Sequence, residues 1–229
     1  VLMVSLSWLK DGLVFTSAKF FKHQGAYSRV PERPEVCDKC DSRSGRFHAH
    51  GRYQRSLTTL KDRFLKTIKI WKHRWLCLCC GRTMSNGSED IMAYKQNCTL
   101  VIVALLWAYL ESGKGLHNGI PQQLDQAASP KTLWRYFKQA KTVCRQTQQS
   151  IRELLIEVTE PRPWDDCFFH GLSPPQGFFN RHRDVPKTRD LWRTLSMLRI
   201  GSRTLSKAPC LLMARARTAA QQKHLRFLM

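Results

Sequence analysis

Two cysteine pairs, Cys37-Asp-Lys-Cys40 and Cys77-Leu-Cys-Cys80, decide the fold of this chain. A Cys-x-x-Cys turn directs two thiolates toward one point, and two such turns close a tetrahedral site that Zn²⁺ fills at about 2.3 Å per sulfur. The spacing therefore predicts a Cys₄ zinc ribbon, with Cys37, Cys40, Cys77 and Cys80 as the ligands of one structural zinc ion. A disulfide or a redox pair is the alternative for these cysteines.

The segment between the two pairs predicts the strands of the ribbon. Tyr53–Leu60 and Phe64–Trp75 are rich in β-branched and aromatic residues and alternate in hydropathy as strands do. The second of these strands delivers Cys77 to the metal. The turn signal Asn86-Gly-Ser88 marks the end of the sheet, so we assign residues 36–90 to the ribbon.

The net charge of the chain indicates what kind of molecule it binds. It carries 38 Lys and Arg against 17 Asp and Glu, a net charge of +21, which favours nucleic acid over an anionic membrane surface. The longest apolar run, Cys98–Leu110, is shorter than the about 20 residues that a membrane helix needs. The chain has nine cysteines, and their spacing follows metal ligation rather than a disulfide framework, which fits a reducing compartment. We therefore expect a cytoplasmic, nucleoid-associated protein without a membrane span.

The pattern changes to helices over residues 98–160. Thr99–Leu110 is apolar nearly all round, as expected of a helix buried among others, and it ends at Ser112-Gly113. A short helix is predicted over Ile120–Ala127. Ser129-Pro130 then supplies an N-cap with proline at the first helical position, which opens a helix that runs to about residue 157.

This last helix has two faces in its first half. On a helical wheel the apolar face comprises Leu133, Tyr136, Phe137, Ala140, Val143 and Cys144, and the basic face comprises Lys131, Arg135, Lys138 and Arg145. The order of helix, short helix, turn and basic helix is that of a helix-turn-helix, whose second helix enters the major groove of DNA. We expect DNA contacts from Ser129, Lys131, Thr132, Trp134, Arg135 and Lys138. The alternative is an amphipathic helix whose basic face is only solvated.

Several short motifs resemble a known family. They are Cys37-x-x-Cys40, His50-Gly-Arg-Tyr53, Arg74-Trp-Leu-Cys77-x-x-Cys80 and Thr132-Leu-Trp-Arg-Tyr136. Together they resemble the zinc-ribbon plus helix-turn-helix region of insertion-sequence transposases and of their small relatives, over residues 36–145. The resemblance implies binding to terminal-repeat DNA, with the four cysteines as zinc ligands. Cys79 and the polar stretch at residues 86–90 depart from the family pattern.

A catalytic domain is not predicted. The resemblance implies that a complete transposase continues into a domain with three carboxylates that hold Mg²⁺. Here Asp165 and Asp166 are adjacent, and no glutamate follows Glu160. We therefore expect a sequence-specific double-stranded DNA-binding protein of mobile-element type that is not an enzyme. The alternatives are an active transposase or transposase subunit, and an RNA-binding zinc protein in which Trp71-Lys-His-Arg-Trp75 stacks bases.

The remaining segments complete the predicted α+β organisation. Residues 1–35 form a lead into the ribbon, and residues 161–229 form a loop followed by a basic helical tail. Within that tail we expect helices over Leu191–Ile200 and Pro209–Leu228. The sequence leaves the oligomeric state open, including a homodimer.

Overall fold

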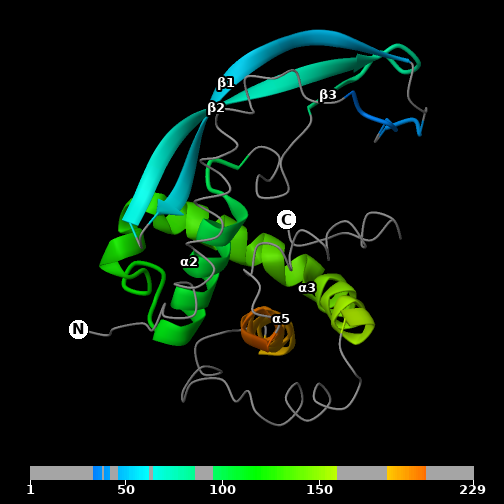
Figure 1. Cartoon of the computed structure of the whole chain (residues 1–229). Coiled ribbons are helices and arrows are strands. Elements are labelled where there is room, and N and C mark those ends of the chain that lie inside the picture. Colours follow the sequence, from blue (N-terminus) through cyan, green and yellow to red (C-terminus); the bar gives the residue numbers. More distant parts are fainter. Residues whose placement is uncertain are drawn as a thin grey trace.

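The computed structural model of the chain combines a three-stranded antiparallel sheet with helices (Figure 1). It describes residues 33–37, 39–41, 46–61, 64–85, 95–158 and 185–204. The sheet has the order β1-β2-β3, formed by β1 (Phe47–Lys61), β2 (Phe64–Cys77) and β3 (Thr83–Ser85). The helices are α2 (Thr99–Ser112), the 3₁₀ helix η1 (Gln122–Ala127), α3 (Pro130–Val158) and α5 (Val185–Thr204). The predicted α+β class is therefore confirmed.

A long hairpin of β1 and β2 makes up most of the sheet. The two strands pair from Phe47 opposite Cys77 to Lys61 opposite Phe64, so both reach further toward the cysteines than the sequence predicted. β3 pairs with the end of β2, where Met84 lies opposite Trp75. Figure 1 shows the hairpin curving above the helices, with its turn end near α2 and the end of β2 extending away from them.

The hairpin buries opposite faces at its two ends. Toward the turn, Leu57, Ile68 and Ile70 belong to the hydrophobic core that includes α2, α3 and α5. Toward the cysteine pairs, Trp75 and Cys77 are buried in a second, smaller core. Because successive side chains of a strand point to opposite faces, the even positions of β2 face the helices and its odd positions face the other way.

A β-bulge at His50 bends β1 between these two ends. Ala49 lies opposite Trp75 and Gly51 lies opposite Arg74, so His50 is an extra residue without a counterpart on β2. Gly51 has a φ of 116°, a backbone conformation that residues with a Cβ rarely adopt. Such a bulge increases the local twist and bends the strand. This is consistent with the curvature of the hairpin in Figure 1.

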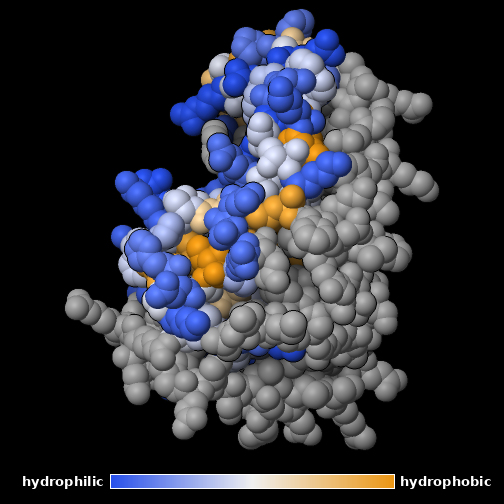
Figure 2. Space-filling view, turned by 90° about the vertical axis from the view of Figure 1, so that its left-hand side faces the viewer, coloured by the Kyte–Doolittle hydropathy of each residue, from blue (hydrophilic) through white to orange (hydrophobic). Residues whose placement is uncertain are grey.

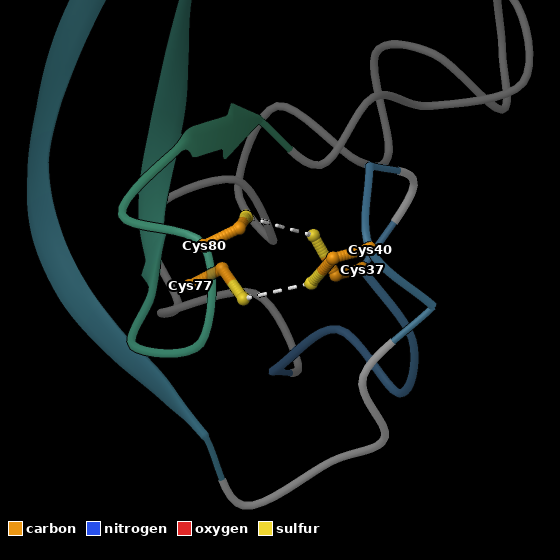
Figure 3. A group of neighbouring side chains, drawn as sticks. All are labelled: Cys37, Cys40, Cys77 and Cys80. Carbon is orange, nitrogen blue, oxygen red and sulfur yellow. Dashed lines mark hydrogen bonds between the residues drawn. The ribbon is translucent and has the colours of Figure 1, made fainter.

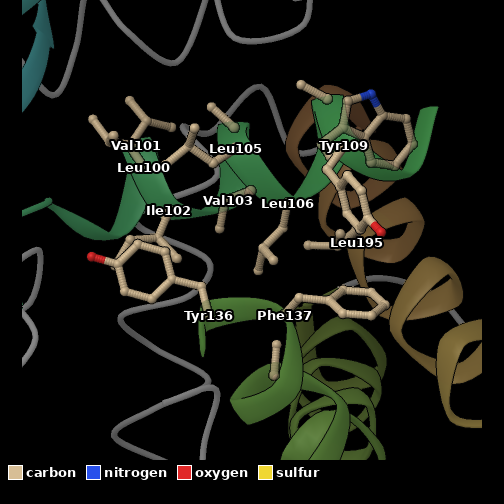
Figure 4. Close-up of a cluster of buried hydrophobic side chains, with 14 of the residues drawn as sticks. Leu100, Val101, Ile102, Val103, Leu105, Leu106, Tyr109, Tyr136, Phe137 and Leu195 are labelled. Carbon is tan, nitrogen blue, oxygen red and sulfur yellow. The ribbon is translucent and has the colours of Figure 1, made fainter. Parts of the chain in front are cut away.

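Helix α2 lies at the centre of the helical part. Every residue from Thr99 to Leu110 is buried, as its apolar sequence predicted. Tyr136 and Phe137 of α3 point toward it, and Leu195 of α5 lies beside it (Figure 4). Full burial of each Leu, Ile or Val side chain contributes about 1.5–3 kcal/mol, so α2 contributes strongly to the stability of this core. The helix ends as predicted, with Gly113 at a φ of 57°.

Helix α3 begins at a serine cap and runs without interruption. The Thr132 backbone N–H donates to Ser129 Oγ at 3.2 Å, and Pro130 occupies the first helical position. The predicted apolar face is confirmed, because its members are buried or, for Val143, half-buried: Leu133, Tyr136, Phe137, Ala140 and Cys144.

Residues 95–98 connect the hairpin to the helices. Thr58 of β1 donates its N–H to the Gln96 carbonyl at 2.7 Å and accepts from the Cys98 N–H at 2.9 Å. The buried Asn97 side chain donates to the Ala127 carbonyl at 2.9 Å and lies 3.3 Å from the Tyr136 hydroxyl. One buried amide thus connects the end of η1 to α3.

Two predicted helices differ from the structure, and other predictions lie outside the described residues. The segment predicted as Ile120–Ala127 is a 3₁₀ helix over Gln122–Ala127, because Pro121 disfavours a helical backbone at Ile120 and is itself extended, with a ψ of 149°. The helix predicted over Leu191–Ile200 is longer, since α5 covers Val185–Thr204. The predicted helix at Pro209–Leu228, the lead at 1–32 and Asp165-Asp166 all fall in segments that the structure does not describe. Among the described helices, none combines the length and apolar character of a membrane span.

Candidate metal centre and nucleic-acid interface

The four predicted zinc ligands come together at the outer end of the hairpin. Cys37 and Cys40 face Cys77 and Cys80 across a small gap, with all four sulfurs directed into it (Figure 3). The four Sγ atoms lie within 4.8 Å of one another, and no other group of three or more potential metal ligands gathers in the described part of the chain. The sequence spacing therefore identified the cluster correctly.

Both cysteine pairs are held by the same backbone turn. The Asp41 N–H donates to the Cys37 carbonyl at 3.0 Å, and the Gly81 N–H donates to the Cys77 carbonyl at 2.9 Å. The residue after each pair is left-handed, with a φ of 54° at Asp41 and 66° at Gly81. Aspartate and glycine are residue types that tolerate this conformation. The two turns thus present their thiols in equivalent ways from separate parts of the chain.

The sulfur positions fit a tetrahedral zinc site. A metal–sulfur distance of about 2.3 Å places neighbouring sulfurs of a regular tetrahedron about 3.8 Å apart. The Cys37 and Cys80 sulfurs are 3.8 Å apart, and those of Cys40 and Cys77 are 3.6 Å apart. A disulfide would require about 2.05 Å, and all four cysteines are free thiols. Four soft sulfur donors suit Zn²⁺, and four protein ligands leave no open position for a substrate, as in structural sites.

The Cys80 thiol resists ionisation within the cluster when no cation is bound. A hydrogen bond from the Arg82 backbone lowers the pKa of the Cys80 thiol, but burial and the three neighbouring thiols outweigh it and raise that pKa to about 12. Crowded thiols resist ionisation because thiolates repel one another at this distance. A divalent cation reverses this balance, since it binds thiolates and displaces their protons.

Cys79 lies outside the cluster although it is next to Cys80. Its side chain is exposed, and its sulfur accepts a hydrogen bond from Arg46 Nη1 at 3.2 Å. Cys37 and Cys77, in contrast, are buried beside Phe47 and Trp75 in the small core at this end of the hairpin. The structure therefore separates Cys79 from the four candidate ligands.

The structure exposes the predicted DNA-contacting stripe of α3. Lys131, Arg135 and Lys138 are exposed, and Trp134 between them keeps 45% of its surface accessible. Ser129 and Thr132 lie at the start of this stripe, where Ser129 Oγ caps the helix by accepting from the Thr132 N–H and lies 3.0 Å from the Thr132 hydroxyl. A hollow of about 500 Å³ opens at this end of α3, lined by Leu116, His117, Ser129, Pro130, Lys131 and Trp134.

Arg145 differs from the other members of the predicted basic face. Its Nε lies 2.7 Å from Asp190 Oδ2 of α5, and this ion pair raises the pKa of the guanidinium. The carboxylate offsets the positive charge at this position. The sequence wheel could not show this, because the partner is on a helix that follows α3 in the chain. Arg145 therefore remains exposed on the predicted basic face, with its charge offset by Asp190.

A second basic and aromatic region lies on the hairpin. Figure 2 shows hydrophilic residues gathered over the upper part of the molecule, which is formed by the strands. There the Arg52 guanidinium lies 4.8 Å from the centre of the Trp71 ring, across the two strands. Trp71 is 38% exposed, whereas Trp75 is 5% exposed. Sequence reasoning treated these two tryptophans as one motif, and the structure gives them different environments.

Comparisons with protein-family models, with curated proteins and with solved structures give no significant match to this chain.

Proposed function

We propose that this chain is a zinc-stabilised protein that binds double-stranded DNA sequence-specifically through the first half of α3. The observation that carries the proposal is the exposed stripe of Lys131, Arg135 and Lys138 on a helix whose opposite face is anchored in the core. These residues are spaced so that they lie on one side of a helix. A helix held in this way can enter a major groove without losing its own packing.

The electrostatics of the chain support the same proposal. The net charge of +21 provides the sequence-independent attraction to phosphates on which most DNA affinity rests. Pro130 has no N–H, and the Thr132 and Leu133 N–H groups bond to Ser129, so at this end of α3 the exposed Lys131 side chain supplies the charge that attracts a phosphate. The side chains of Lys131 and Arg135 would then read base edges, for which arginine and lysine prefer guanine.

The mobile-element context of this DNA binding rests on the motif resemblance at residues 36–145. An active transposase would need a group of carboxylates for Mg²⁺. In the described ranges the cysteine cluster is the one group of three or more close metal-ligating side chains. We therefore propose a DNA-binding protein of transposase-related type, acting at the nucleoid, without catalysis by the described residues.

Replacement of Arg135 by alanine is expected to weaken binding to a selected duplex by about 1–3 kcal/mol and to relax its base preference, as the loss of a bidentate base contact does. Arg193→Ala is the matched control, because Arg193 is an equally exposed arginine on α5. It should lower affinity for all duplexes alike. The measurement is fluorescence anisotropy on selected and scrambled duplexes. An unchanged ratio of specific to non-specific affinity in Arg135→Ala would show that α3 is not the recognition helix.

The purified chain is expected not to cleave DNA in Mg²⁺ or Mn²⁺, because the carboxylates after residue 160 are Asp165, Asp166, Asp184 and Asp190, with no late glutamate to complete an acidic triad. The measurement is a supercoiled-plasmid nicking assay with both metals. Cleavage that persists through purification and disappears in Asp166→Ala would restore the active-transposase alternative.

A further inference from the structure

One face of the hairpin carries three opposed pairs of polar, basic and aromatic side chains. We call it the Trp71 face, and it consists of Arg52 opposite His73, Gln54 opposite Trp71, and Ser56 opposite Lys69. The other face of the same stretch is buried through Leu57, Ile68 and Ile70 against the helical core. By strand alternation, the Trp71 face therefore points away from the helices. Its members are exposed, except His73, which is half-buried.

We propose that the Trp71 face binds single-stranded nucleic acid, with an unpaired base stacked on Trp71 and the adjacent phosphates held by Lys69 and Arg52. This surface is separate from the exposed stripe of α3. The inference therefore stands or fails independently of duplex binding by that helix.

The exposure of Trp71 is the first argument. Trp71 and Trp75 lie on the same face of β2, but Trp75 is covered by the small core that contains Cys37 and Phe47. Trp71 lies just beyond that cover and keeps 38% of its surface accessible. Large aromatic side chains normally bury most of their area, so an indole left open on a sheet offers a flat apolar surface to a ligand. Every nucleobase has a π-face that can stack there, whatever the sequence.

The position of Arg52 is the second argument. Its guanidinium carbon lies 4.8 Å from the centre of the Trp71 ring, within the range of a cation–π contact. This contact holds a positive charge over one face of the indole, close to the backbone phosphates that a nucleotide bound at Trp71 would bring. Arginine and tryptophan together supply the two interactions that non-specific single-strand binding uses, charge attraction and stacking.

The charge of the two strands is the third argument. Neither β1 nor β2 contains an aspartate or glutamate, and the Trp71 face carries the basic residues Arg52 and Lys69. Such a surface attracts a polyanion and offers no counter-charge to a basic partner. An unpaired strand fits better than a duplex, because bases inside a duplex stack on one another and present only their edges.

The test measures the affinity of the full chain for labelled oligo(dT), oligo(U) and a duplex of equal length. Trp71→Ala is expected to weaken single-strand binding by about 5- to 150-fold, the effect of losing one stacked base, and to leave duplex binding unchanged. Trp71→Phe should retain most of the single-strand affinity. Equal binding of oligo(dT) and oligo(U) would show that the face recognises base and phosphate. Binding of oligo(U) alone would show that it also recognises the 2′-hydroxyl of RNA. Equal loss for single strands and duplex, or no loss, overturns the proposal.

Salt dependence separates stacking from charge. Trp71→Ala should leave the dependence of single-strand affinity on salt concentration unchanged, because an indole releases no counterions. Lys69→Gln should reduce that slope by about 0.7, the value for one phosphate contact on a single strand. If Trp71→Ala lowers the slope as Lys69→Gln does, the indole is not a stacking site.

A measurement on the intact chain covers the case in which Trp71→Ala fails to fold. The protein is labelled with 5-fluorotryptophan, and the ¹⁹F resonance of Trp71 is assigned from its absence in Trp71→Phe. Addition of oligo(dT) should shift that resonance and leave the one from buried Trp75 unchanged. A shift of the Trp134 resonance on addition of duplex would report binding at α3 instead. The two resonances therefore distinguish binding at the Trp71 face from binding at α3. An unmoved Trp71 resonance at saturating single strand overturns the proposal.

Discussion

Replacement of Cys77 by serine is expected to abolish zinc binding and to unfold the outer end of the hairpin, while the helical core stays folded. Cys77 is fully buried in a small core whose other buried residues, in the described part of the chain, are Cys37, Phe47 and Trp75. Structural zinc sites contribute about 10–16 kcal/mol of apparent binding free energy, more than so small a core can supply. The inner end of the hairpin has a separate anchor, because Leu57 packs in the helical core.

The measurements are elemental analysis for zinc and amide hydrogen exchange. We expect one zinc ion per chain in the parent protein, and loss of protection in β3 and the last residues of β2 in Cys77→Ser, with α2 still protected. Cys79→Ser is the matched control, since Cys79 is a neighbouring cysteine outside the cluster, and it should retain zinc. Zinc binding that survives Cys80→Ser but not Cys79→Ser would show that the second pair was assigned one residue too far along the chain.

Trp107→Ala is expected to lower the free energy of unfolding by about 3–5 kcal/mol, as for other large-to-small changes in cores. Trp107 is 1% exposed and stacks on Trp192 of α5, with ring centres 4.9 Å apart. Its indole N–H also donates to Glu111 Oε2 at 2.9 Å, so the substitution leaves this half-buried carboxylate without that donor. The loss should therefore loosen α5 as well as α2.

Urea denaturation followed by circular dichroism measures this effect. Trp134→Ala is the matched control, because Trp134 is the same residue type at 45% exposure, and it should cost about 1 kcal/mol or less. The two variants should also separate stability from function, since Trp134 lies in the proposed DNA-contacting stripe. A smaller loss in Trp107→Ala than in Trp134→Ala would contradict the observed packing of α2 and α5.

The features that the sequence predicted best depend on local chemistry. Paired cysteines identify a metal centre because each ligand pair is formed within one turn. The apolar run at Thr99–Leu110 identified a buried helix, and Ser129-Pro130 fixed the start of α3, because capping involves only neighbouring residues. These predictions required no knowledge of which segments meet in space.

The features that the sequence did not predict depend on long-range contacts. The ion pair of Arg145 with Asp190 offsets one positive charge of the predicted basic face. The different burial of Trp71 and Trp75 depends on where the Cys37 turn covers the hairpin. Buried Asn97 links three segments, yet nothing in its local sequence distinguishes it. Strand register and packing between distant segments determine these environments. Both arise only when distant segments of the chain come together.

The bulge at His50 also explains the arrangement of apolar residues along β1. Phe47 and Leu57 are both at odd positions, yet they are buried on opposite sides of the hairpin, one beside the cysteines and one against the helices. In an uninterrupted strand, two odd positions would share a side. The one extra residue shifts the phase of the strand by half a period, so that a single run of sequence serves two cores in turn. If His50 were deleted, the residues of β1 before Gly51 would face the opposite side of the hairpin. Their polar and apolar positions would have to be exchanged to bury the same residues.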